Sequence, residues 1–228
     1  MAAEKARTIS RKAQGEETRA TLLAVASRLF AQKGYDGVSM RTLAAEAGVN
    51  LATVGYHFGG KSGLYQAILE RIIAVRYEIF PKCEEVLDRF ETAGRDLRGK
   101  CAVTDWFVDQ LVRELLGHSE LAWAAFIVSR ELAQPSEWFE GLTREFFTPS
   151  LNSLCALTEG VLPAGASRED VILTGHCVIS MVLKLLEAHT LITRRLGWES
   201  YASHLDDLSA IMKKRIRGLL GLPMEDAR

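Results

Sequence analysis

The residues from Gly55 to Ser62 offer the first candidate chemistry, because they match the pattern of a loop that binds nucleotide phosphates. Gly60, Lys61 and Ser62 stand where that pattern requires glycine, lysine and a hydroxyl group. The mechanism also requires a buried strand before the loop and loop residues slender enough to wrap around phosphate. The preceding residues do not read as a strand, and two aromatic rings and an imidazole occupy the variable positions. We therefore expect no nucleotide hydrolase.

Other catalytic or metal-binding groups do not cluster along the sequence. The five histidines are scattered and form neither a Ser/His/Asp set nor a metal cluster. The cysteines lie too far apart for a Cys-x-x-Cys knuckle, and a chain of 228 residues does not need disulfide staples. Reduced thiols are expected at Cys83, Cys101, Cys155 and Cys177. The sequence thus predicts a protein that is not an enzyme, with no cofactor and no metal site.

The stretch from Val38 to Phe58 has the pattern of two short helices joined by a tight turn. Ser39 and Asn50 are residue types that cap helix N-termini. Gly48 stands where a left-handed residue is needed between two steeply crossed helices, and the small Ala44 lets the helices approach closely. We therefore predict a helix-turn-helix motif.

The second of these helices has distinct inner and outer faces. At 100° per residue, Val54 and Phe58 point inward, whereas Ala52, Thr53 and Tyr56 point outward. This outer face is small, hydroxylic and aromatic, and it carries no acid. Such a face suits a helix that lies in a DNA major groove, although an ordinary surface helix is the alternative.

From Leu22 to Tyr65 the chain resembles the DNA-binding domain of TetR-family repressors. The matching segments, in order, are Phe30-Ala-Gln-Lys-Gly-Tyr35, Val38-Ser-Met-Arg-Thr-Leu-Ala44, Ala47-Gly-Val49 and Tyr56-His-Phe-Gly-Gly-Lys-Ser-Gly-Leu-Tyr65. They span about a fifth of the chain. The resemblance implies an all-α homodimer, with an N-terminal three-helix helix-turn-helix domain and a C-terminal helical domain for ligand binding and dimerisation.

The resemblance also implies roles for individual residues. Arg41 would contact the DNA backbone or a base, the start of the recognition helix would face base edges, and His57 and Lys61 would hold phosphates. The family often has Tyr two residues before this histidine, where this chain has Gly55, so we expect the adjacent Tyr56 to take over part of that contact. The complete predicted DNA-binding set is Arg41, Asn50, Leu51, Ala52, Thr53, Gly55, Tyr56, His57 and Lys61.

The predicted domain organisation has three parts. A flexible basic arm covers residues 1–15, the DNA-binding domain residues 16–61, and the ligand-binding and dimerisation domain residues 62–228. Pro149 is expected to kink or split the helix in which it falls. Apart from the two short helices above, the periodicity predicts helices near 17–33, 62–90, 96–116, 119–133, 137–160, 168–196 and 203–220. The helix over 62–90 is the expected lever between ligand pocket and DNA.

The body is expected to hold a small, largely apolar effector. Segment 119–147 is rich in aromatic residues, and polar groups among apolar neighbours are the natural candidates for orienting a ligand. Plain helical core is the alternative for the aromatics, and a structural ion pair is the alternative for Arg130 with Glu131. The predicted ligand-binding set is Trp106, Trp123, Phe126, Arg130, Phe146, His176, Met181 and Lys184.

The helices near 168–196 and 203–220 are expected to form the homodimer interface. The first is apolar nearly all round, so it needs a partner beyond its own core. Together they resemble the last two helices of TetR-family proteins, which pair across a two-fold axis and so imply a pseudo-palindromic operator. The segments 129–136 and 145–149 resemble the CecR/CerR-type subgroup, which implies control of an efflux operon.

Charge and hydropathy are consistent with this interpretation. Residues 1–61 carry nine Lys and Arg against five Asp and Glu, whereas the whole chain has a net charge of −1. A basic N-terminal quarter is expected if only that part meets phosphate. We find no secretory signal and no membrane span, and we expect a cytoplasmic protein. The alternative is a helical small-molecule-binding protein or enzyme without DNA function.

Overall fold

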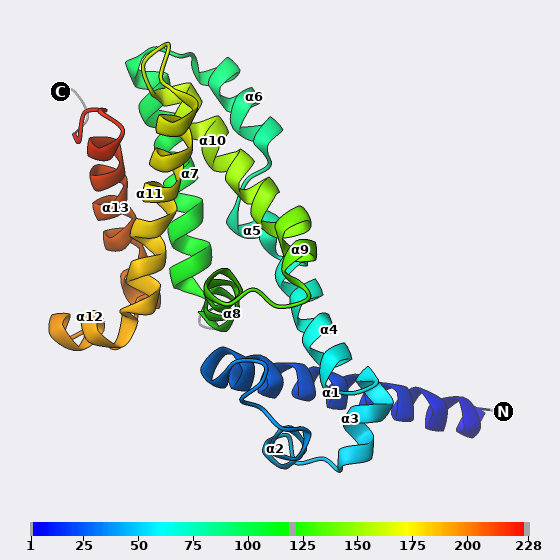
Figure 1. The fold of residues 1–228 in the computed structure, drawn as a ribbon. Coiled ribbons are helices and arrows are strands. Elements are labelled where there is room, and N and C mark those ends of the chain that lie inside the picture. The colour runs from blue at the N-terminus through cyan, green and yellow to red at the C-terminus, as the bar shows by residue number, and fades with distance from the viewer. Residues whose placement is uncertain (1, 119–121, 226–228) are drawn as a thin grey trace. The chain divides into compact units, whose positions relative to one another are not determined.

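Helices account for the regular structure of the chain, and no strand occurs within residues 2–118 and 122–225, the parts that the computed structural model describes (Figure 1). This confirms the predicted all-α fold. The α-helices are α1 (Ala2–Lys33), α2 (Met40–Glu46), α3 (Leu51–Phe58), α4 (Lys61–Ala74), α5 (Arg76–Ile79), α6 (Cys83–Ala93), α7 (Leu97–Gly117), α8 (Ala122–Ala133), α9 (Phe139–Leu142), α10 (Thr148–Val161), α11 (Arg168–Glu187), α12 (His189–Leu196) and α13 (Leu205–Leu219).

The chain folds into two compact units. The first contains residues 1–72 together with 126–138, and the second contains residues 73–125 and 139–228. This division differs from the predicted boundary at residues 61 and 62. Helices α4 and α8 each contribute residues to both units, so two of the three chain crossings lie inside helices.

The first unit is built on α1, α2, α3 and the start of α4. α2 packs against α1 on one side and against α3 on the other. One apolar side chain from each helix is completely buried, so all four helices share one core. These side chains are Leu22, Leu43, Val54 and Leu64.

The second unit is organised around α7, which packs against α6, α10, α11 and α13 (Figure 1). Apolar residues line α7 on several sides, as expected for a central helix. Its side toward α13 is polar. Asp109 accepts hydrogen bonds from Ser209 (2.5 Å) and Lys213 (2.8 Å), and Asp105 pairs with Arg217. Burial alone would raise the pKa of Asp109, but the hydrogen bonds from Lys213, Ser209 and Arg113 lower the pKa below its usual value.

The first helix is longer than predicted. α1 begins at Ala2 rather than near Glu17, so the backbone of the segment predicted to be a flexible arm is helical. The prediction of the helix start is wrong because it relied on an apolar stripe, which begins only at Leu22. Residues 2–14 lack that stripe but are rich in Ala, Lys, Arg, Glu and Gln, which favour helix through backbone propensity alone.

The predicted helix over 62–90 is wrong, because three helices occupy this range. α4 ends at Ala74, α5 ends at Ile79, and α6 begins at Cys83. Pro81 has no backbone N–H and forces the residue before it out of the helical region, and Phe80 is indeed extended (φ −109°, ψ 118°). A rigid lever can therefore extend no further than Ala74.

Two later helices are also divided. The predicted effect of Pro149 is confirmed, since a π-helical turn over Thr143–Phe147 separates α9 from α10. The predicted single helix over 168–196 is wrong, because α11 and α12 meet at an angle of 69°. The Tyr201 hydroxyl donates a hydrogen bond to the carbonyl of Leu185 (3.1 Å), close to the break, so a tertiary contact stabilises the bend.

We expect Gly160→Ala to destabilise the second unit by about 1–3 kcal/mol, the usual cost of an overpacked core. A Cβ atom at Gly160 would lie 2.2 Å from Cε2 of the buried Phe90, where α10 packs against α6. Urea unfolding would measure the change. Gly141→Ala is the matched control, because Gly141 is also helical but a Cβ atom there would have no neighbouring atom within 4 Å, so it should be neutral or stabilising. Equal stability of the two variants would contradict the packing argument.

Candidate nucleic-acid interface

The turn between α2 and α3 has the geometry that its residues predicted. The Ser39 hydroxyl accepts a hydrogen bond from the amide of Thr42 (3.1 Å), which caps α2. The Asn50 side chain accepts from the amide of Thr53 (2.8 Å), which caps α3. Gly48 has a φ of 66° in the left-handed region. Two side-chain caps and one glycine therefore define the turn, and the predicted helix-turn-helix is confirmed.

The outer face of α3 is free of acids and open to solvent. Leu51, Ala52 and Gly55 are exposed, and Tyr56 is the most open large side chain at 86% exposure. Val54, on the opposite side, is completely buried and anchors the helix. No acid occurs from residue 47 to residue 69, so no carboxylate on this stretch would repel a phosphate.

The predicted base-facing residue Thr53 is less exposed to solvent than Leu51 and Ala52. It is half-buried, and its hydroxyl donates a hydrogen bond to the Asn50 side chain (2.9 Å). In this arrangement the hydroxyl of Thr53 supports the cap of α3. The capping role of Asn50 likewise occupies its side-chain oxygen.

The two predicted phosphate contacts lie on either side of the α3–α4 junction. His57 is half-buried beside the ring of Tyr56, with 5.2 Å between ring centroids. Lys61 is the first residue of α4, and its Nζ atom lies 4.2 Å from the centroid of the Tyr35 ring. Gly59 and Gly60 between them have φ angles of 72° and 128°. The phosphate-loop pattern thus falls on a helix and a two-glycine turn, whereas a phosphate loop follows a strand.

The segment 126–138 adds a buried polar contact to the first unit, which carries α3. Glu131 is 3% exposed and accepts hydrogen bonds from the hydroxyl of Tyr65 (2.7 Å) and from the hydroxyl (2.7 Å) and amide (3.2 Å) of Ser136. Burial, followed by the hydrogen bond to Glu131 and its negative charge, raises the pKa of Tyr65 far above its usual value. The phenol therefore stays neutral, and Glu131 ties α8 to α4.

Aromatic contacts reinforce this segment. The Trp138 ring lies 5.0 Å from Tyr35 and 5.0 Å from Tyr65, between ring centroids, and Tyr65 lies 5.0 Å from Phe30. Arg130 donates hydrogen bonds to the carbonyls of residues 31 and 32 at the end of α1, at 3.5 and 3.3 Å. A cation at this position suits the negative end of a helix. The unit that carries α3 therefore includes α8 residues that are distant in sequence.

Two family profiles match different parts of the chain. The family profile "Bacterial regulatory proteins, tetR family" matches residues 22–68. The profile "HTH-type transcriptional dual regulator CecR, C-terminal domain" matches residues 104–222, which is more than half of the chain. The chain is a TetR-family transcriptional regulator with a CecR-type C-terminal domain. It is a regulator rather than an enzyme, as are the proteins that it resembles.

Individual relatives agree with this assignment. The HTH-type transcriptional dual regulator CecR of Shigella flexneri is 25% identical over 198 residues, which are 86% of this chain and 87% of that protein. The regulator AcrR of Shigella flexneri is 41% identical over 59 residues, which are 26% of this chain and 27% of that protein.

Solved structures share the fold. AibR, crystallised in complex with isovaleryl coenzyme A and operator DNA, has a TM-score of 0.57 at 17% identity and covers 85% of this chain and 97% of its own. HlyIIR, a haemolysin II transcriptional regulator, has a TM-score of 0.55 at 19% identity and covers 88% of this chain and 97% of its own.

The predicted ligand-binding residues of this TetR-family regulator are divided between the two compact units. Phe126 and Arg130 belong to the DNA-binding unit, where Arg130 caps α1. His176 and Lys184 are exposed on α11, with Lys184 paired to Glu187. The expected alternative, an ion pair between Arg130 and Glu131, is not formed either, because the two side chains bind different partners. Trp123 and Met181 are half-buried, and Phe146 is buried.

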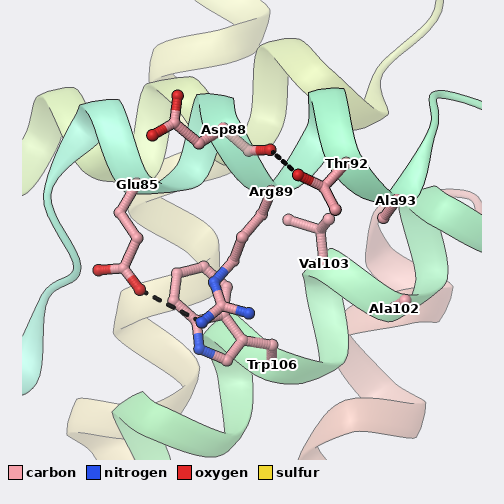
Figure 2. Close-up of a pocket in the computed structure, with 8 residues that line it drawn as sticks. All are labelled: Glu85, Asp88, Arg89, Thr92, Ala93, Ala102, Val103 and Trp106. Atoms are coloured by element: carbon pink, nitrogen blue, oxygen red, sulfur yellow. Dashed lines mark hydrogen bonds and ion pairs between the residues drawn. The ribbon is translucent and has the colours of Figure 1, made fainter.

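Trp106, from that set, lines a groove of about 370 Å³ between α6 and α7. Figure 2 shows Arg89 lying over the Trp106 ring, 3.7 Å from its centroid, while it pairs with Glu85 (3.3 Å). The groove is open, and two of its charged groups, Arg89 and Glu85, pair with each other. The remaining lining residues are Asp88, Thr92, Ala93, Ala102 and Val103.

Metal and membrane sites receive no support from the geometry. Across the described ranges no three His, Cys, Asp or Glu side chains are grouped to hold a metal ion, and the four cysteines are free thiols. Taken singly, the described helices are too short or too polar to cross a membrane; the bent pair α11 and α12 meets the criterion by length and composition alone.

Proposed function

We propose that this TetR-family regulator is a ligand-responsive repressor that binds a pseudo-palindromic operator as a homodimer. The observation that supports it best is the acid-free, solvent-exposed face of α3, which Val54 anchors and two side-chain caps orient. A helix held in this way can enter a major groove without a reorganisation penalty. Leu51, Ala52 and Thr53 are proposed to face the bases, while Arg41, Tyr56, His57 and Lys61 hold the backbone.

Release by a small, largely apolar effector is proposed to work by linkage. The free dimer fits the operator, and the effector favours a state in which the two recognition helices are spaced differently. Because α4 ends at Ala74, a long lever to residue 90 does not exist. We propose instead that α4 and α8 share the coupling, since each contributes residues to both units. An efflux operon is the proposed target.

Direct binding tests the proposal. Fluorescence anisotropy with labelled duplexes from the DNA flanking the gene should reveal saturable binding that weakens as salt increases. Absence of binding to any duplex at low salt would instead support a helical small-molecule-binding protein without DNA function. A reporter measured with and without the gene would then distinguish repression from activation.

We expect Lys61→Ala to weaken binding to all DNA sequences by a similar factor. The logarithm of the DNA-binding constant falls linearly with the logarithm of the salt concentration, and loss of one phosphate contact should make this slope less steep by about 0.9. Lys61→Arg keeps the charge and should largely restore both properties. Arg95→Ala removes an exposed cation from the second unit, outside α11, α12 and α13, and serves as the matched control. An unchanged slope for Lys61→Ala would contradict the proposed phosphate contact.

A further inference from the structure

Arg76 is a buried cation for which the structure provides no counter-charge. Its side chain is 3% exposed, and its Nε atom has no hydrogen-bond partner. Among the described residues, no carboxylate lies within 4.0 Å of the guanidinium. The ring of Tyr77 lies 3.5 Å away, but an aromatic face does not replace an anion.

Two other guanidinium groups of the same unit are compensated. Arg217 is also buried and pairs with Asp105, while Arg113 binds Asp109 (2.8 Å) and Asp206 (2.7 Å). Arginine side chains keep their positive charge in folded proteins. A buried charge without a partner is strongly unfavourable. Arg76 is therefore the position in this unit where an incoming anion would gain most.

An aromatic pair, Phe80 and Phe146, belongs to the same compact unit as Arg76. Phe80 lies one helical turn further on, with its amide bonded to the Arg76 carbonyl (2.8 Å), so both side chains start from the same face of α5. The buried Phe80 ring meets the ring of Phe146 edge to face, 6.3 Å between centroids. Phe146 belongs to the π-helical turn, where Thr143 also buries a hydroxyl without a hydrogen-bond partner. π-helical turns frequently occur at functional sites.

We propose that Arg76 binds the anionic end of the effector, a small amphipathic molecule with a carboxylate or phosphate group and an apolar body. The planar guanidinium matches both anions through paired hydrogen bonds, and the Phe80–Phe146 pair supplies the apolar wall. This inference rests on the proposed ligand response and names its chemical class.

The position of Arg76 also explains how the anion would act. Arg76 follows the break at Val75 that ends α4, and it lies four residues after the unit boundary at Ile72. Since the guanidinium is covered, an anion reaches it only when the covering side chains move. Anion binding therefore changes the start of α5, the segment that continues directly from α4.

Thermal unfolding of the full-length protein with defined probes tests this inference. Octanoate and hexyl phosphate present the two candidate anions, and octanol is the neutral control. The anion that matches the effector should raise the melting temperature of the wild type by about 3 °C or more at saturation, and octanol should raise it by much less. Equal effects of octanol and both anions, or no effect of either anion, would overturn the proposal.

Variants assign the binding to Arg76. Arg76→Met should raise the melting temperature of the free protein by about 2–4 °C, because it removes the unpaired charge, and should abolish the anion-dependent shift. Arg76→Gln keeps a polar group and provides a second variant with the same expected loss. Arg89→Met is the matched control, because Arg89 also lies over an aromatic ring but is exposed and paired with Glu85. Anion shifts that persist in both Arg76 variants would overturn the assignment.

The DNA-binding measurement keeps the two proposals separate. If the protein binds duplex DNA but shows no anion-dependent shift, the repressor proposal stands and the Arg76 site fails. If the anion shift depends on Arg76 but no duplex binds, the site stands and the repressor proposal fails.

Discussion

Replacing Glu131 by Ala is expected to lower the free energy of unfolding of the DNA-binding unit by about 2–4 kcal/mol. The substitution removes the acceptor of three hydrogen bonds and leaves the buried Tyr65 hydroxyl without a partner. Because Tyr65 lies on α4 and packs against Phe30 of α1, loosening it should also reduce DNA affinity. Urea unfolding followed by the fluorescence of Trp138, which lies against Tyr65, would measure the loss.

Glu137→Ala is the matched control for this prediction, since Glu137 is an exposed carboxylate of the same segment. It should change stability by less than about 0.5 kcal/mol. A double-mutant cycle of Tyr65→Phe with Glu131→Ala should give a coupling energy of about 1 kcal/mol or more, because the two side chains share one hydrogen bond. Additive effects, or equal losses from Glu131→Ala and Glu137→Ala, would show that α8 does not stabilise this unit through Glu131.

The features that could be predicted from the sequence are those with local causes. Ser39, Gly48 and Asn50 act within a few residues of their own positions, so residue type and spacing were enough to place the helix-turn-helix. The effect of Pro149 was predictable for the same reason. Pro81 is an equally local signal. The predicted helix over 62–90 is wrong because apolar periodicity continues on both sides of Pro81, although this proline interrupts the helix.

The features that sequence analysis missed depend on partners far away in the chain. Nothing near Ala188 signals a bend, whereas Tyr201 reaches back to Leu185 to stabilise it. Glu131 stands out in the sequence as a polar residue among apolar ones, but its partner Tyr65 lies 66 residues earlier. Arg76 gave no sequence signal at all, since an arginine shows its burial and its missing counter-charge only in three dimensions.

The proposed effector site illustrates the same limit. Helical periodicity indicates that a helix has an apolar face, but not which element covers that face. His176 and Lys184 lie on the exposed side of α11, and Arg130 belongs to the other compact unit altogether. Residue type alone therefore does not show where in the fold a polar side chain lies.

Ile211→Asp is expected to convert the proposed homodimer to a monomer and to weaken binding to the proposed operator by about 100-fold or more. Ser209, Lys213 and Arg217 hold one face of α13 against α7, so Ile211 and Leu219, two turns apart, lie on the outer face and are exposed. On α11, Leu173 is 64% exposed. A carboxylate buried against such an apolar surface costs several kcal/mol, and about 2.8 kcal/mol corresponds to a factor of 100. Sedimentation equilibrium and anisotropy would measure both effects.

The control for Ile211→Asp must place the same charge on an equally apolar surface position outside α11, α12 and α13. Leu87 on α6 is exposed and meets this condition, so Leu87→Asp should remain a dimer with unchanged DNA affinity. If Ile211→Asp stays dimeric, the two-fold interface lies elsewhere on the molecule. If it becomes monomeric but keeps full operator affinity, one recognition helix is sufficient, and the requirement for two half-sites fails. Both losses together would place the α11–α13 surface at the two-fold axis, because a single α3 helix contacts too few bases to hold an operator by itself.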